Sequence, residues 1–266
     1  MPALLDKMLA VARRDLLTAL RYRSGFVLTI LGSVVQLAAF YYLSRSIGLN
    51  FHPDGMDYFS FVLAGTGLYT FLIMSVQVFV SVVQEAQQTG TLEVLMTTAT
   101  APSLLVTLSA ISASGRNALQ LLFYLTTGVL LFGVRLRANL AACLLLLLLS
   151  FSIAAAVGLM AAAVQLTIHK GSAVVWLLGS LSWLLTGALF PVANLPQALQ
   201  APARFLPITH CITGLRLALF EGAGLASLGR EFGVLALSLL ILLPLGLLMF
   251  NQALRQSRIS GTLSFY

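Results

Sequence analysis

The side chains that could carry out acid-base or metal chemistry are few and far apart. The three histidines are His52, His169 and His210, and long apolar stretches separate them. On the topology expected below, His52 and His210 lie on one face of a membrane and His169 on the other. A metal triad or a Ser-His-Asp arrangement needs its members on the same face. The sequence therefore predicts no catalytic residue and no metal site.

Nucleotide chemistry is also not expected within this chain. The two lysines are Lys7 and Lys170, and Lys170 stands in HKGS without the glycine-rich lead that a phosphate-binding loop needs. Any ATP and Mg²⁺ must therefore bind to a separate subunit. We expect no cofactor in this chain.

Composition identifies the elements that must position the remaining polar residues. The 266 residues are 59% hydrophobic and only 9% charged, which is typical of a polytopic membrane protein. Each apolar window must form a helix, because lipid leaves no partner for free backbone groups and runs such as 144–149 lack the alternation of a barrel strand. The predicted fold is all-α with six transmembrane helices. They are 25–44, 58–83, 112–134, 139–167, 172–193 and 231–251.

The distribution of cations predicts the orientation. Residues 1–24 form an amphipathic helix with leucines on one side and Lys7, Arg14 and Arg21 on the other. We expect it to lie on the inner leaflet with this basic face toward anionic head groups, the alternative being a solvated cytoplasmic helix. Arg255 and Arg258 follow the last span, so both termini are predicted to be cytoplasmic, and no cleaved signal peptide is expected. The net charge of +7 is spread over loops and termini, which argues against binding to nucleic acid.

Two segments depart from the pattern of simple spans and loops. Residues 84–103, QEAQQTGTLEVLMTTATAPS, are polar and amphipathic between two apolar windows. Residues 194–222 are apolar but rich in proline, and proline prevents one continuous helix. We expect a pair of short re-entrant helices there, between the fifth and sixth spans. Their breaks are predicted at Pro191, Pro196, Pro202 and Pro207.

Three stretches resemble the type-2 membrane subunits of ATP-binding-cassette (ABC) transporters. RRDLLTALRYRSGFVLTILGSVVQ is similar to the basic entrance helix of that family and its first span. QEAQQTGTLEVLMTTATAPS is similar to its coupling segment. The prolines with Thr209-His210 and Leu215-Arg216 recur at the spacing of its re-entrant helices.

The resemblance implies a role for each of these segments. Residues 84–103 would form a cytoplasmic coupling helix that docks onto the ATPase. The residues implied are Glu85, Thr91, Leu92, Glu93, Leu95 and Met96. The four prolines and His210 would form an outer gate. One expected partner is a separate ABC ATPase in two copies, and the other is a second permease subunit, with a homodimer favoured over a heterodimer.

The function implied is that of an exporter permease in the bacterial inner membrane. An apolar path with few charges suits an amphipathic drug, a lipid or a lipid-linked saccharide. Two alternatives are an ion-coupled secondary transporter and a membrane assembly factor without an ATPase. The spans carry no acidic residue near their middle, which argues against the first, and no reactive pair is visible for the second.

Overall fold

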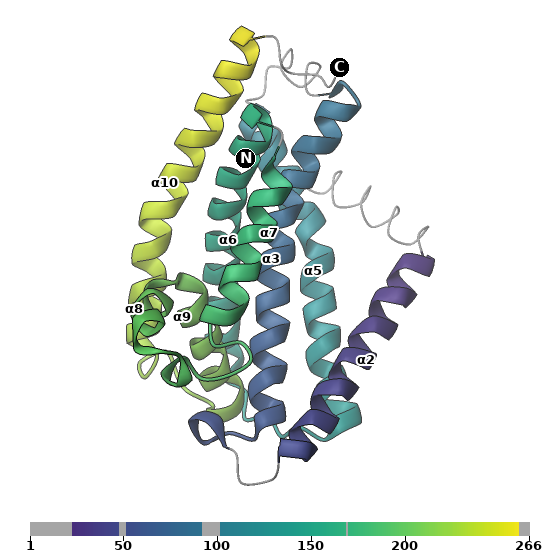
Figure 1. Cartoon of the computed structure of the whole chain (residues 1–266), viewed down its shortest axis with the longest axis vertical. Coiled ribbons are helices and arrows are strands. Elements are labelled where there is room, and N and C mark those ends of the chain that lie inside the picture. Colours follow the sequence, from purple (N-terminus) through teal and green to yellow (C-terminus); the bar gives the residue numbers. More distant parts are fainter. Residues whose placement is uncertain (1–22, 48–51, 92–101, 169, 261–266) are drawn as a thin grey trace.

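The computed structural model describes residues 23–47, 52–91, 102–168 and 170–260 (Figure 1). Within these ranges the chain is all-helical, as predicted, and forms eight α-helices. They are α2 (Arg23–Ile47), α3 (Tyr58–Gln88), α5 (Pro102–Phe132), α6 (Leu140–Ile168), α7 (Gly171–Leu185), α8 (Gln197–Phe205), α9 (Pro207–Arg216) and α10 (Gly229–Ser260). Three short turns also occur, η1 (Pro53–Gly55), η2 (Val192–Asn194) and the π-helical η3 (Leu217–Glu221).

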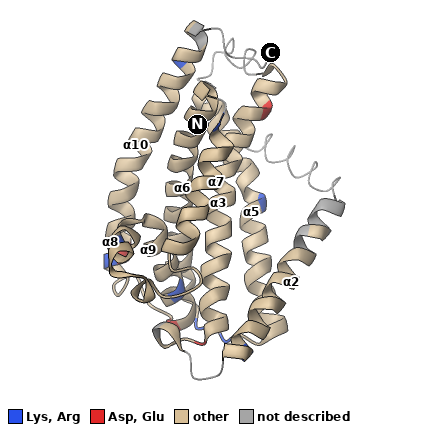
Figure 2. Cartoon of the chain, viewed as in Figure 1, with Lys and Arg blue, Asp and Glu red and all other residues tan. Residues whose placement is uncertain are grey.

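Six of the helices run along the long axis of the molecule, and α8 and α9 gather near one end (Figure 1). We name the ends after Gln87, in the last turn of α3, and Arg216, at the end of α9. Charged residues lie mainly toward these two ends (Figure 2). The long middle of the bundle therefore carries few charges, as a membrane requires.

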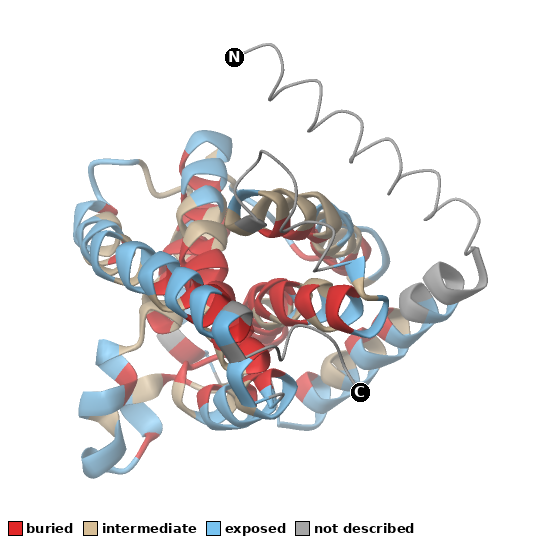
Figure 3. Ribbon diagram, turned by 90° about the horizontal axis from the view of Figure 1, so that it is seen from above, coloured by how far each residue is buried: buried red, intermediate tan, exposed pale blue. Residues whose placement is uncertain are grey.

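The core lies between α3 and α6. Large side chains that are fully buried, such as Leu68 and Phe79 on α3 and Leu146 and Leu159 on α6, fill it. In the most apolar window of α3, 61% of the residues are buried, against 11% for α10. Helix α10 packs on α6 at the rim and turns most of its leucines outward (Figure 3). Such an apolar outer surface suits contact with lipid.

Three helices in the described ranges are both long and apolar enough to cross a membrane, namely α3, α6 and α10. Helices α2 and α5 have 25 and 31 residues, which is also sufficient length. Helix α5 begins at Pro102, ten residues before the predicted start of the third span. The six-span topology, with α2, α5 and α7 as the other spans, stays a prediction.

Helix α7 is shorter than the predicted span 172–193. It ends at Leu185, and its 15 residues cover about 22 Å at 1.5 Å per residue, less than the ~30 Å of a bilayer core. The chain then bends through Gly187, whose φ of 74° few other residues adopt. It continues into η2, α8 and α9, the short helices expected of the re-entrant segment.

Candidate functional site

At the Arg216 end, one buried arginine joins three segments of the chain. The Arg216 side chain is 4% exposed. Its Nε donates to the carbonyl of Phe61 at 3.0 Å, and Nη2 donates to Gly187 and Ala188 at 2.9 and 3.0 Å. The guanidinium also stacks 3.4 Å from the Phe61 ring centre. Arg216 therefore gives hydrogen-bond donors to carbonyls just beyond α7, where the helix has stopped.

Gly65 makes room for this arrangement. A Cβ on Gly65 would overlap both Nη2 of Arg216 and the carbonyl oxygen of Ala188. Only a glycine lets α3 approach the bend after α7 this closely. The predicted topology places Arg216 in the outer segment between the fifth and sixth spans and does not indicate that it is buried. Its place in the apolar run ITGLRLALF was the one available signal.

His210 ties together the short helices and α10. Its Nδ1 lies 2.5 Å from Oε2 of Glu231, in the first turn of α10. Its Nε2 lies 2.9 Å from the carbonyl oxygen of Arg204, in the last turn of α8. Both partners accept hydrogen bonds, so an imidazole carrying two protons satisfies both. His210 thus holds α8, α9 and α10 at one point.

The four prolines of the predicted gate are all in the described part of the chain. Pro191 precedes η2, Pro196 precedes α8, and Pro207 begins α9. Pro202 lies inside α8 and does not break it, contrary to the sequence expectation. Only three of the prolines therefore mark the ends of helices. Among the described residues, no group of three His, Cys, Asp or Glu side chains could hold a metal ion.

Cys211 is buried beside this cluster. The predicted topology places it in the outer segment between the fifth and sixth spans, near the membrane surface, but its side chain is only 1% exposed. It faces the core, together with Ile212 and Leu215 of the same helix. A water-soluble thiol reagent would not reach it.

At the Gln87 end, a buried pair of amides links three helices. Gln165, in the last turn of α6, donates from Nε2 to Oε1 of Gln87 at 3.3 Å. Its own Oε1 accepts the backbone N–H of Gly171, the first residue of α7, at 2.9 Å. Gln87 and Gln165 are 1% and 2% exposed. A shift in the last turn of α3 would therefore act directly on the turn between α6 and α7.

This amide pair lies at the start of the predicted coupling segment, 84–103. Residues 84–88 continue α3, which ends at Gln88. Glu85 is exposed, and its carbonyl accepts hydrogen bonds from the N–H and Oγ1 of Thr89. Thr91 Oγ1 lies 2.8 Å from Thr89 Oγ1, and Gly90 turns the chain with a φ of 68°. The other coupling residues, Leu92, Glu93, Leu95 and Met96, lie outside the described residues, as do Lys7, Arg14 and Arg21.

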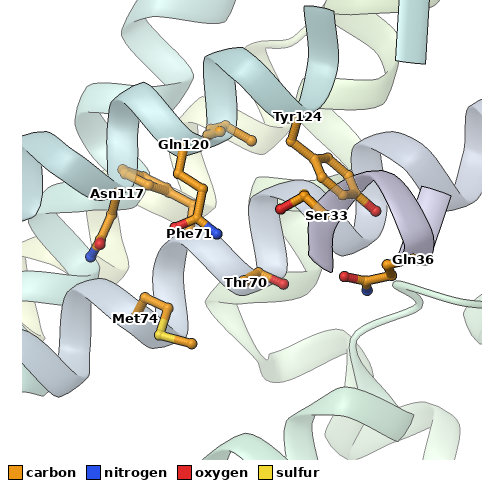
Figure 4. A pocket seen from close by; sticks show the side chains of 10 residues that line it. Ser33, Gln36, Thr70, Phe71, Met74, Asn117, Gln120 and Tyr124 are labelled. Atoms are coloured by element: carbon orange, nitrogen blue, oxygen red, sulfur yellow. The ribbon is translucent and has the colours of Figure 1, made fainter. Parts of the chain in front are cut away.

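A polar cluster not noticed in the sequence lies between α2, α3 and α5 (Figure 4). Gln36, Thr70 and Gln120 line a cavity of about 30 Å³, which is large enough to hold a water molecule. Nearby, the hydroxyls of Thr66 and Tyr124 lie 2.9 Å apart. Polar side chains at membrane depth turn toward the protein interior or toward an aqueous path.

On the other side of Met74, α3 and α7 form an open groove of about 730 Å³. Its wall is aromatic where the rings of Trp183 and Tyr69 pack with their centres 4.8 Å apart. The Tyr69 hydroxyl donates to the carbonyl of Gly179. The wall is polar where Gln77 donates to Ser172 at 3.3 Å. Met74 also lines the polar cluster, so groove and cluster adjoin along α3. A surface with both characters suits an amphipathic molecule.

The sequence profile of a family described as ABC-2 type transporter matches residues 6–220, which is more than half of the chain. The match covers the coupling segment, α7 and the short helices after it. None of the curated proteins matches the chain.

Proposed function

Because the chain belongs to the ABC-2 type transporter family, and so is a membrane component of an ABC transporter, we propose that it is the permease of an exporter. Two copies form the translocation path between them. A separate ATPase, also in two copies, binds ATP and Mg²⁺ and drives transport. A homodimer is favoured over a heterodimer, and the complex lies in the bacterial inner membrane with both termini of the permease in the cytoplasm.

The observation that carries the coupling mechanism is the contact between Gln87 and Gln165. Residues 84–103 dock onto the ATPase through Glu85, Thr91, Leu92, Glu93, Leu95 and Met96, as the family resemblance implies. Gln87 lies within this segment and bonds to Gln165, which in turn holds the first residue of α7. Closure of the ATPase on ATP would therefore be passed to α7 through two successive hydrogen bonds, both made by Gln165. Differential binding of the closed state then shifts the population of permease conformations.

The groove between α3 and α7 supports an amphipathic substrate. Trp176, on its α7 side, is 72% exposed, so a second copy of the chain or a substrate could cover it. The mixture of aromatic and amide groups in the groove fits a drug, a lipid or a lipid-linked saccharide. The path would run along this face of α3.

The short helices at the Arg216 end form the outer gate of this path. Pro191, Pro196 and Pro207 separate them, so each helix can move as a unit. His210 fastens them to α10. We expect deletion of residues 194–208 to abolish substrate-coupled ATP hydrolysis in a correctly inserted protein. Unchanged transport and unchanged hydrolysis would show that no such gate exists.

Joint expression tests the proposed function. The permease should co-purify with its ABC ATPase, in equal numbers of the two chains. Proteoliposomes that contain the complex should hydrolyse ATP faster when the transported amphiphile is present. Transport that runs on an ion gradient without any ATPase would contradict the proposal and favour a secondary transporter.

A further inference from the structure

A polar cavity of about 540 Å³ lies beside the buried arginine at the Arg216 end. Its walls are formed by the end of α7, η2, α8, α9 and the start of α10. Thr186, Arg204, His210, Arg216, Arg230 and Glu231 are the lining residues that matter here. It is more polar than the groove between α3 and α7, and the packing of the helices does not account for its polar lining.

The charges around this cavity do not balance. Three guanidinium groups line it, from Arg204, Arg216 and Arg230, against the single carboxylate of Glu231. That carboxylate already pairs with His210 at 2.5 Å. Among the described residues, neither Arg204 nor Arg230 forms an ion pair, and both are exposed. The cavity is therefore positive and has two arginine forks available for an anion.

A buried hydroxyl in the same cavity lacks a partner. Thr186 is 1% exposed, and its Oγ1 makes no hydrogen bond to any residue that the structure describes. Thr209, which also lines the cavity, uses its hydroxyl on the carbonyl of Ala203 at 2.7 Å. A buried hydroxyl without a partner is uncommon, because leaving it unsatisfied costs free energy. Rotation of the Thr186 side chain toward the cavity would let a bound acceptor satisfy this hydroxyl.

An apolar cavity adjoins the polar one. Leu185, the neighbour of Thr186, lines a cavity of about 290 Å³ together with Leu206 and Ile208. Two faces of α9 separate the two cavities. Ile208 and Cys211 face the apolar cavity, and Thr209 and His210 face the polar one. An anionic group and an apolar chain therefore have adjoining places at this end of the molecule.

We propose that the polar cavity binds the anionic head group of an amphiphile, a phosphate or carboxylate, through Arg204, Arg230 and the Thr186 hydroxyl. Arg216 is committed to backbone carbonyls and adds its positive field. The amphiphile is either a resident membrane lipid or the exported molecule. The second case rests on the proposed export function, whereas anion binding itself does not.

The test measures binding to the purified permease in neutral detergent, without any ATPase. Dioctanoyl phosphatidylglycerol should bind at least about tenfold more tightly than dioctanoylglycerol, which lacks the anionic phosphate, since charge-assisted hydrogen bonds to the phosphate contribute that much. The double variant Arg204→Gln/Arg230→Gln should lose this preference, and Thr186→Val should reduce it. The matched control is Arg135→Gln/Arg137→Gln, two exposed arginines between α5 and α6 that do not line the cavity, and it should keep the preference.

Native mass spectrometry separates the two sources of the ligand. A resident lipid would co-purify with the wild-type permease and be absent from Arg204→Gln/Arg230→Gln. If the ligand is the cargo, no lipid co-purifies, and phosphatidylglycerol still binds and speeds ATP hydrolysis by the complex. Equal affinity for the two lipids, or unchanged preference in the double variant, would overturn the proposal. Because binding needs no ATPase, this result stands even if the coupling mechanism fails.

Discussion

Gln165 donates its side-chain amide to the side-chain oxygen of Gln87 across 3.3 Å, and so connects the last turns of α6 and α3. The two residues are 78 positions apart in the chain. Both are almost fully buried. A buried amide needs its partners, so this contact specifies one arrangement of the helices next to the coupling segment.

Gln87→Leu should weaken both the fold and the coupling. It leaves the amide of Gln165 buried without that acceptor, a loss of about 1–3 kcal/mol in the free energy of unfolding. Thermal unfolding in detergent measures this loss, and ATP hydrolysis by the complex should respond less to substrate. Gln88→Leu is the control, because Gln88 is exposed on the same turn and should change stability by less than about 0.5 kcal/mol. Equal behaviour of the two variants would show that the buried contact is unimportant.

Gly65→Ala should disturb the Arg216 end. The added methyl group overlaps the Arg216 guanidinium and the Ala188 carbonyl, and overpacking of this kind costs about 1–3 kcal/mol. Thermal unfolding should show the loss. Gly32→Ala is the matched control on α2, since nothing lies within 4 Å of a Cβ there and the change should be neutral or slightly stabilising. Loss of stability in Gly32→Ala alone would contradict this account of the close approach.

Cysteine labelling tests the predicted topology. Both native cysteines are buried, and they are first replaced by alanine so that only the introduced cysteine can react. Ala226→Cys, in the exposed turn before α10, should react with a membrane-impermeant thiol reagent from outside the cell. Thr98→Cys, within the coupling segment, should react only after the membrane is opened. Labelling of both positions from the same side would refute the six-span arrangement.

Apolar windows predicted the long helices but not all of their ends. Residues 186–193 are as apolar as the helix before them, so the sequence extended the fifth span through them. The helix stops at Leu185, and Arg216, some 30 residues later, supplies donors to the carbonyls of Gly187 and Ala188 beyond it. Hydropathy measures the average character of a window and cannot detect such a distant donor.

The candidate sites were predicted as segments, not as contacts. Proline spacing indicated the short helices, and the polar stretch 84–103 indicated where the chain leaves the apolar bundle. The contacts of Gln87 with Gln165 and of Arg216 with Phe61 join residues 78 and 155 positions apart. No local pattern carries that information. The polar cavity at the Arg216 end is formed by residues at the ends of α7, α8, α9 and α10, and the sequence likewise did not reveal it.

The most direct test of the central claim replaces Leu92 and Leu95 by Asp in the permease co-expressed with its ATPase. If residues 84–103 dock onto the ATPase through apolar contacts, Leu92→Asp/Leu95→Asp should still insert in the membrane. It should no longer co-purify with the ATPase, or should hydrolyse ATP without transport. The measurement is the ratio of ATPase to permease after purification from the membrane. A double variant that retains its ATPase at the wild-type ratio and transports normally would contradict the coupling role of this segment.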